Sequence, residues 1–265
     1  MTLARTYLDH NATEPLRPEA RQAMLVAMDA FGNPSSVHGE GRAARAIVEA
    51  AREQVAEVVF TSGATEANTF AINGRPWRAL LVGNAEHSAV LAPARRSHAP
   101  RLELPCRSDG VQDLSGVEAW AAALPKSAQP ALASLALANG ETGVVQPVAD
   151  LVAMLTPFGV VVHSDAVQAT GRIVVDFRAL GLSLMSLSAH KMGGPKGVGA
   201  LIVRDGTPLE ALLAGGGQES RRRAGTENVI AIAGFGAAAA AARRDLEHVD
   251  RIRDLRDGLE AELLR

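Results

Sequence analysis

Cysteine is nearly absent from this chain of 265 residues. Cys106 is the only one, which excludes an internal disulfide and any cluster of thiolate metal ligands. A marked excess of charge is also missing, because 27 Lys and Arg residues stand against 29 Asp and Glu residues, for a net charge of −2 at pH 7. This balance gives no reason to expect nucleic acid or an anionic membrane as the main partner.

Long apolar runs are lacking as well. No run approaches the roughly 20 residues of a membrane span, and the first residues, MTLARTYLDHNAT, lack the apolar core of a signal peptide. We therefore expect a cytoplasmic protein. Hydrophobic residues still make up 47% of the chain, which is enough for a sizeable core, and the length fits one large domain or one domain with part of another.

Short apolar runs alternate with helical patterns along the chain. Strands are expected over residues 79–83, 131–138, 160–163, 184–188 and 199–204. Apolar residues at helical spacing predict helices over residues 18–31, 115–124 and 147–155. Another helix is expected after Pro34, and its apolar face extends to Val55 and Val58. Near-continuous apolar strands separated by helices predict an α/β fold with a mainly parallel sheet covered on both faces.

Several predicted strands end in polar residues that could bind a ligand. Residues 59–68, VFTSGATEAN, lead into a helix, whose first N–H groups suit a phosphate, although an ordinary helix cap explains the same residues. Asp165, with Gln168 three residues on, pairs with a cationic ligand nitrogen or caps the next helix. His87 is either a structural residue or a catalyst.

The stretch SAHKMGGPKG (188–197) carries more information. Lys191 ends a predicted buried strand, where loss of hydration lowers the pKa of its amine and frees it for Schiff-base chemistry. Gly193 and Gly194 would let the backbone pass close to a bulky ligand. The alternative is a glycine-rich turn beside a lysine that reaches solvent. The loop GGGQESRRRAGTEN (215–228) likewise binds phosphate or is a mobile basic loop.

These groups follow successive strands, and ligands of such sheets bind at the carboxyl ends of the strands. Together they are the parts that pyridoxal phosphate needs: a lysine for the aldehyde, an aspartate for the ring nitrogen, a flat side chain to stack on the ring, and a helix start for the phosphate. We therefore predict a pyridoxal-phosphate site.

The chain resembles the cysteine desulfurases of the NifS/IscS type, in the class V aminotransferase group of pyridoxal-phosphate enzymes. The shared motifs follow one another over nearly the whole chain: YLDHNAT (7–13), FGNPSSVH (31–38), FTSGATEAN (60–68), AEHSAV (85–90), ANGETGVVQPV (138–148), HSDAVQ (163–168), SAHKMGGPKG (188–197) and RRRAGTEN (221–228).

This resemblance implies a role for each motif residue. Lys191 would bind the cofactor aldehyde, Asp165 would pair with the ring nitrogen, and His87 would stack on the ring and share in proton transfers. Gln168 would bond the phenolic oxygen, and Asn139 belongs to the family's Asn-Asn-Glu motif, whose second position here is Gly140. The residues implied to hold phosphate are Ala64, Thr65, Ser188 and His190, with Thr226 reaching the phosphate of the other subunit.

Three further departures from the family pattern concern function and packing. The family's sulfur-accepting cysteine and its substrate-binding arginine lie beyond the Gly-Thr motif, after the point where this sequence stops, and Cys106 matches neither position. Residues 51–63 form a shorter connection than is usual in the family. From Thr226 onward the pattern is helical almost to the end, with no closing strand, which we interpret as a truncated small domain.

The resemblance implies the fold of the type I pyridoxal-phosphate transferases, with a sheet of the seven-stranded type. We expect an N-terminal segment over 1–14, a large cofactor-binding domain over 15–240, and a helix over 241–265 that leads into the truncated domain. The implied function is removal of sulfur from L-cysteine to give L-alanine, by a homodimer that passes sulfur to an acceptor or iron–sulfur scaffold protein. Alternatives are a selenocysteine lyase-like enzyme, or an inactive pyridoxal-phosphate-binding scaffold.

Overall fold

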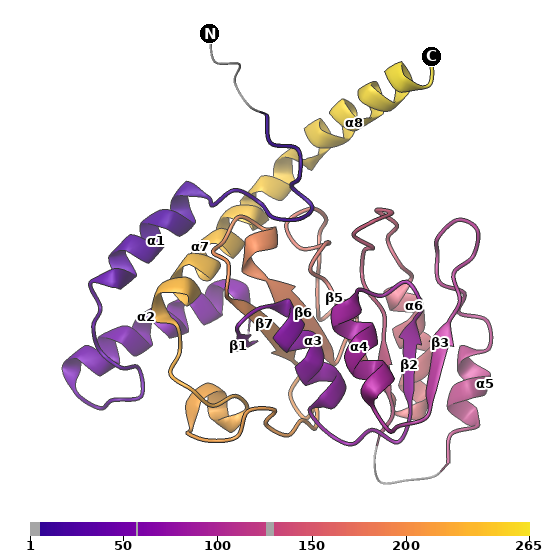
Figure 1. The fold of residues 1–265 in the computed structure, drawn as a ribbon, viewed down its shortest axis with the longest axis horizontal. Helices are drawn as coiled ribbons and strands as arrows, with labels where there is room; N and C mark the ends of the chain where they lie inside the picture. Colours follow the sequence, from indigo (N-terminus) through magenta and orange to yellow (C-terminus); the bar gives the residue numbers. More distant parts are fainter. Residues whose placement is uncertain (1–5, 57, 126–129) are drawn as a thin grey trace.

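A seven-stranded sheet forms the centre of the computed structural model, which describes residues 6–56, 58–125 and 130–265 (Figure 1). The strand order is β1-β7-β6-β5-β4-β2-β3, and only β7 runs antiparallel to its neighbours. The strands are β1 (Val58–Thr61), β2 (Leu80–Gly83), β3 (Arg101–Leu104), β4 (Leu132–Ser134), β5 (Val161–Asp165), β6 (Leu184–Ser188) and β7 (Gly199–Val203). The predicted α/β fold and mainly parallel seven-stranded sheet are confirmed.

Helices cover both faces of the sheet because successive strand residues point to opposite sides. Met185, Leu187 and Ile202 pack in one core with residues of α2, α6 and α7, whereas Leu184 and Leu201 pack in the other with residues of α3 and α4. The helices are α1 (Pro18–Met28), α2 (Gly39–Val55), α3 (Ala64–Asn73), α4 (Ser88–Arg96), α5 (Val117–Ala122), α6 (Val148–Leu155), α7 (Val229–Asp245) and α8 (Val249–Leu263).

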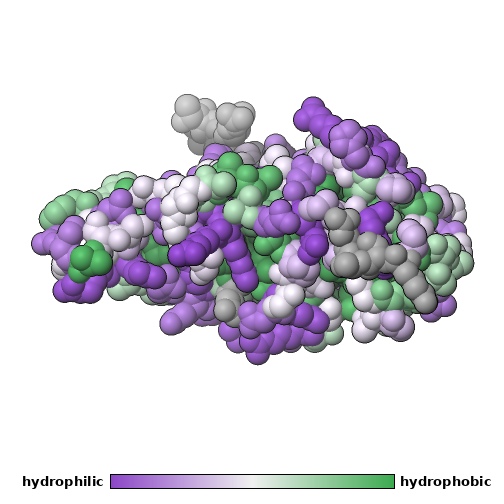
Figure 2. All heavy atoms as spheres, turned by 90° about the horizontal axis from the view of Figure 1, so that it is seen from below, coloured by the Kyte–Doolittle hydropathy of each residue, from purple (hydrophilic) through white to green (hydrophobic). Residues whose placement is uncertain are grey.

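The last helix differs from the others, because α8 projects away from the body of the molecule and none of its residues is buried (Figure 1). Elsewhere the surface is mixed: Figure 2 shows hydrophilic residues over much of one face, with hydrophobic patches between them. In the part of the chain that the structure describes, no helix is long and apolar enough to cross a membrane.

Some predicted boundaries were wrong. Val58 does not extend the helical face, because α2 ends at Val55 and Val58 opens β1. The helix predicted to reach residue 31 ends at Met28, and Phe31 is 86% exposed. The strand β3 was not predicted, because it lies at the sheet edge and only its last residue, Leu104, is buried.

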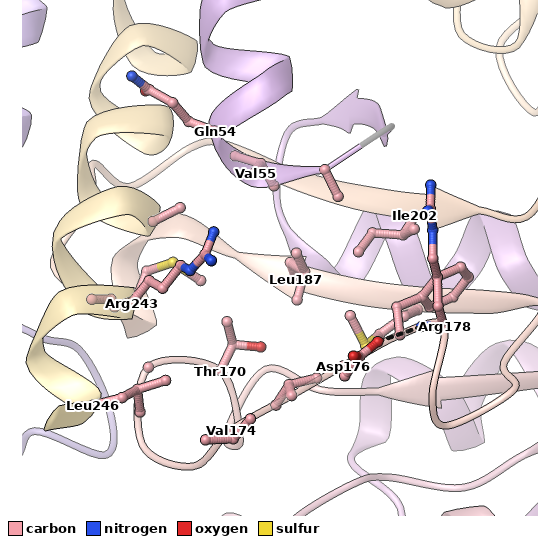
Figure 3. Close-up of a pocket in the computed structure, with 18 of the residues that line it drawn as sticks. Gln54, Val55, Thr170, Val174, Asp176, Arg178, Leu187, Ile202, Arg243 and Leu246 are labelled. Carbon is pink, nitrogen blue, oxygen red and sulfur yellow. Dashed lines mark hydrogen bonds between the residues drawn. The ribbon is translucent and has the colours of Figure 1, made fainter.

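A cavity of about 690 Å³ lies on the sheet face that α2 and α7 cover, beside the short connection from α2 to β1 (Figure 3). Val55, Leu187 and Ile202 line it from α2, β6 and β7, and Arg243 and Leu246 line it from the end of α7 and the turn that follows. None of the predicted site residues lines this cavity.

Candidate active site

A second, larger cleft of about 1030 Å³ lies where five strands end. The strands β1, β2, β4, β5 and β6 all point the same way, so the segments that follow them meet at one edge of the sheet. Nine of the ten predicted site residues line this cleft, namely Ala64, Thr65, His87, Asn139, Asp165, Gln168, Ser188, His190 and Lys191.

Asp165, the last residue of β5, supplies a buried carboxylate. Its Oδ2 accepts a hydrogen bond from Asn68 Nδ2 (2.7 Å), and its Oδ1 accepts one from the Val167 N–H (3.0 Å). Burial raises the pKa of Asp165, while these two bonds and the nearby His87 and Lys191 act in the opposite direction. Because a cation placed against this carboxylate would offset the cost of its burial, the site favours a positively charged ligand group.

Lys191 projects into the same cleft from the short 3-10 turn Ala189–Lys191 that follows β6. Its Nζ donates to the Asn11 carbonyl (2.6 Å), and Arg172 Nη1 donates to the Lys191 carbonyl (3.1 Å). Partial burial, and then the charge of Arg172, lower the pKa of Lys191. Its amine is therefore a better nucleophile near neutral pH than the amine of an exposed lysine.

The glycines after Lys191 serve packing more than ligand access, which corrects our interpretation. Gly193 has a φ of +83°, and a Cβ there would lie 2.5 Å from the Arg17 side chain. A Cβ at Gly194 would lie 2.9 Å from that of Ala189. Of this group only Gly197, with a φ of +80°, lines the cleft.

His87 stands at the N-terminus of α4, where it caps the helix. Its Nδ1 accepts a hydrogen bond from the Ala89 N–H (3.1 Å). In the neutral ring the proton is therefore on Nε2, and the ring itself is exposed on the side of the cleft. This arrangement leaves Nε2 available for proton transfer.

Gln168 and Gly140 lie together on another wall of the cleft. Gln168 Nε2 donates to the Asn11 carbonyl (3.1 Å), while its Oε1 is buried and has no partner among the described residues. A Cβ at Gly140 would lie 3.2 Å from the Gln168 side chain. The glycine therefore gives Gln168 room in its present position.

The far end of the cleft is formed by the start of α3 and the end of β6. Ala64 and Thr65 open α3, so their N–H groups have no partner within the helix. Ser188 is buried nearby, and His190 Nδ1 lies 3.1 Å from Thr13 Oγ1. Burial, with the neighbouring Lys191 and Lys196 charges, lowers the pKa of His190. Helix N–H groups and hydroxyls together suit a phosphate.

The loop 215–228 is anchored beside this end, which argues against a mobile loop. Glu219 is buried and accepts hydrogen bonds from Arg52 (2.8 and 3.0 Å) and from the Phe60 N–H (2.9 Å). Arg223 pairs with Glu66 in the first turn of α3 (2.9 Å). Burial alone would raise the pKa of Glu66, but its bonds from Arg223 and the Ser62 N–H outweigh that effect and lower it.

Comparisons with known proteins agree on one family. The sequence pattern of the aminotransferase class-V family matches residues 6–263. A cysteine desulfurase from Cereibacter sphaeroides is 44% identical over 99% of this chain and 71% of its own length. The cysteine desulfurase IscS from Dictyoglomus turgidum is 40% identical over 95% of this chain and 67% of its own length.

The chain belongs to the aminotransferase class-V family. Within it, the chain groups with the NifS/IscS-type cysteine desulfurases, and the predicted resemblance is confirmed. The structure of a NifS-like protein from Rickettsia africae superposes with a TM-score of 0.93 at 33% identity, covering 98% of this chain and 75% of the other. Proteins of this family use pyridoxal phosphate, which is therefore the cofactor of this chain.

The class-V site in this structure fits that cofactor. Lys191 has a nucleophilic amine in the cleft, and Asp165 is a buried acid without a cationic partner within bonding distance among the described residues. Gln168 Oε1 is buried and can accept a hydrogen bond, since it has no partner among the described residues. A phosphate can reach the first N–H groups of α3, and the cleft is large enough for a cofactor with an amino acid.

Thr226 is the one predicted residue of the class-V site that lies outside the cleft. It lines a separate cavity of about 220 Å³. Ser62, Gly197 and Val198 line both spaces, so the two are adjacent. The implied contact of Thr226 with another subunit stays a prediction.

Three residues of the site were missed from the sequence: Asn11, Asn68 and Glu86. Each lies inside a motif quoted above, next to or near a predicted residue, and each lines the cleft. Asn68 orients Asp165, and the Asn11 carbonyl accepts from both Lys191 and Gln168. Their position within YLDHNAT, FTSGATEAN and AEHSAV was the available signal.

Proposed function

We propose that this chain performs the pyridoxal-phosphate chemistry of a cysteine desulfurase, which converts L-cysteine to L-alanine and passes the sulfur to an acceptor for iron–sulfur cluster or thio-cofactor assembly. The observation that carries the proposal is the convergence of Lys191, Asp165 and His87 in one cleft of sufficient size. Relatives at 44% and 40% identity that bear the name cysteine desulfurase support the choice of substrate.

Each residue has a role that follows from its position. The bound cofactor supplies an electron sink for the α-carbon of the amino acid. Asp165, fixed by Asn68 and Val167, would hold a proton on the ring nitrogen by charge pairing. Lys191 would hold the aldehyde until the amino acid displaces it. His87, with Nδ1 occupied, would exchange protons through Nε2.

The phosphate-binding role belongs to the other end of the cleft. Ala64 and Thr65 would donate backbone N–H groups, with Ser188 and His190 beside them. Asn139 is held by its bond from Nδ2 to the Ala85 carbonyl (2.9 Å), so it would form part of the wall beside His87.

The sulfur step needs a thiolate that attacks the sulfur of the substrate, forming an S–S bond while the C–S bond breaks. Cys106, the only cysteine of the sequence, does not line the cleft, and its Sγ lies 3.8 Å from the Gly110 carbonyl. The proposal therefore assigns the attacking thiol to a group outside these 265 residues.

Finer parts of the proposal depend on assembly. We include a two-fold homodimer in which Thr226 faces the partner's cleft, and an acceptor or scaffold protein for the sulfur. The cytoplasmic location and the division into 1–14, 15–240 and 241–265 stay predictions.

The test is exchange of the substrate α-proton. The chain loaded with pyridoxal phosphate and L-cysteine in deuterated water should exchange the α-proton, as followed by NMR. When a thiol acceptor is added, alanine should form together with the persulfide of that thiol, and excess thiol should then release the sulfur as sulfide while it is oxidised to a disulfide. Binding of the cofactor without exchange would support an inactive scaffold instead, and strong preference for selenocysteine over cysteine would support the lyase alternative.

A further inference from the structure

Glu86 is a carboxylic acid buried in the wall of the cleft. It is 6% exposed and lies in the turn 84–87, between β2 and α4. Its Oε1 accepts a hydrogen bond from the N–H of Ala136, just beyond the end of β4. Its Oε2 is buried and has no partner among the residues that the structure describes. The proposed reaction gives this residue no role.

The turn that holds Glu86 ends in His87, so the position of one residue sets that of the other. Two hydrogen bonds tie the turn to the segment after β4. One joins Glu86 to Ala136, and the other joins the Ala85 carbonyl to Asn139 Nδ2 (2.9 Å). Because His87 follows Glu86 directly, a movement of the turn backbone away from this wall would also move the His87 ring.

The surroundings of Glu86 keep its carboxyl group uncharged at neutral pH. Burial raises its pKa to about 8, a bond from the Ala136 N–H opposes the rise, and the charge of Asp165 adds to it. Negative charge on Asp165 therefore disfavours ionisation of Glu86. The charged or titratable side chains that share the cleft with Glu86 are Asp9, His87, Glu141, Asp165, His190, Lys191 and Lys196.

We propose that Glu86 is the positioning residue of His87: its uncharged carboxyl group holds the turn 84–87 against the end of β4, and loss of its proton releases this turn and weakens cofactor binding. An ionised Glu86 would be buried beside Asp165 with one oxygen unbonded, which is unfavourable unless the turn opens to water. A glutamine at this position would keep the bond to Ala136 but could not lose a proton.

The experiment first examines the chain without cofactor, so that it does not depend on the proposed function. The seven histidines are labelled with ¹³C, and the His87 signal is assigned by its loss in His87→Asn. Wild type is compared with Glu86→Gln, Glu86→Ala and the control Glu118→Gln, which changes an exposed glutamate on α5. The His87 signal of the wild type and the control should shift in a step near pH about 8, and Glu86→Gln should lack this step.

Pyridoxal-phosphate affinity, which rests on the proposed function, is the second readout. The pH is raised from one unit below about 8 to one unit above it. Over this range the ratio of the wild-type dissociation constant to that of Glu86→Gln should rise about tenfold, as expected for one lost hydrogen bond. Glu86→Ala should bind about tenfold more weakly than wild type at the lower pH.

Two results would overturn the inference. One is a wild-type His87 signal whose pH dependence equals that of Glu86→Gln. The other is a folded Glu86→Ala variant with unchanged His87 signal and cofactor affinity. If Glu86→Ala does not fold, the comparison with Glu86→Gln decides. If no variant binds the cofactor, wild type included, the proposed function fails, and the His87 signal still tests the role of Glu86.

Discussion

Replacing Glu86 by glutamine should stabilise the cofactor-free chain at alkaline pH. The pKa of Glu86 is about 8 in the folded chain, against an ordinary value of 4.5 in the unfolded chain. The folded state therefore holds the proton more tightly. Stability from this group is fully present below about 4.5 and is lost as the pH rises through about 8. The full difference corresponds to about 5 kcal/mol of unfolding free energy.

Glutamine cannot ionise, so the unfolding free energy of Glu86→Gln should lack this loss. Relative to wild type, the variant should gain about 1.4 kcal/mol per pH unit between about 5 and about 8, and no more above that range. Urea unfolding of both proteins at several pH values, with Glu118→Gln as an exposed control, measures the gain. Parallel curves for wild type and Glu86→Gln would show that Glu86 is ionised in the folded chain, and the reasoning would be wrong.

Three other changes have definite expected outcomes. Glu219→Ala should lower the unfolding free energy by about 3–5 kcal/mol, because it leaves Arg52 and the Phe60 N–H without their buried partner. Urea unfolding measures this loss, and a value below about 1 kcal/mol would contradict the prediction. Asp165→Asn should retain the cofactor but slow α-proton exchange sharply, as measured by NMR in deuterated water, since a neutral amide cannot keep the ring nitrogen protonated; equal exchange rates would refute that role. The 265-residue chain without an added thiol should release no alanine from L-cysteine at a useful rate, and Cys106→Ser should change nothing; turnover that Cys106→Ser abolishes would place the nucleophile there.

The positions of Lys191 and Asp165 could be predicted because the rule that locates them is geometric. Both follow apolar runs that form adjacent parallel strands, and the carboxyl ends of such strands meet at one edge. Neither position required knowledge of side-chain packing to be predicted. The implied phosphate-binding residues and Thr226 came from the family resemblance, since small residues at a helix start fit a cap as well as a ligand.

The errors have physical causes of their own. The glycines after Lys191 were assigned to a ligand, but Gly193 makes room for Arg17, which lies 176 positions earlier in the sequence (193 − 17). Contacts of this kind leave no local pattern. Val58 continued the helical spacing, yet the chain turns at once into β1 because the connection is short.

Glu86 was overlooked for a related reason. A glutamate in a sequence is most often exposed, and its burial here depends on the turn 84–87 packing against the end of β4. Its pKa also depends on the charge of Asp165, which lies at the end of β5. Only the folded cleft brings these two carboxyl groups close enough for the charge of Asp165 to raise the pKa of Glu86.

The central claim is that Lys191 holds the cofactor, and trapping tests it most directly. The chain is mixed with pyridoxal phosphate and reduced with borohydride, and the labelled peptide is identified by mass spectrometry. Lys196 also lines the cleft but is exposed, so Lys196→Ala is the matched control. We expect the label on Lys191, kept in Lys196→Ala and lost in Lys191→Ala. A label on Lys196, or an undiminished label in Lys191→Ala, would contradict the account.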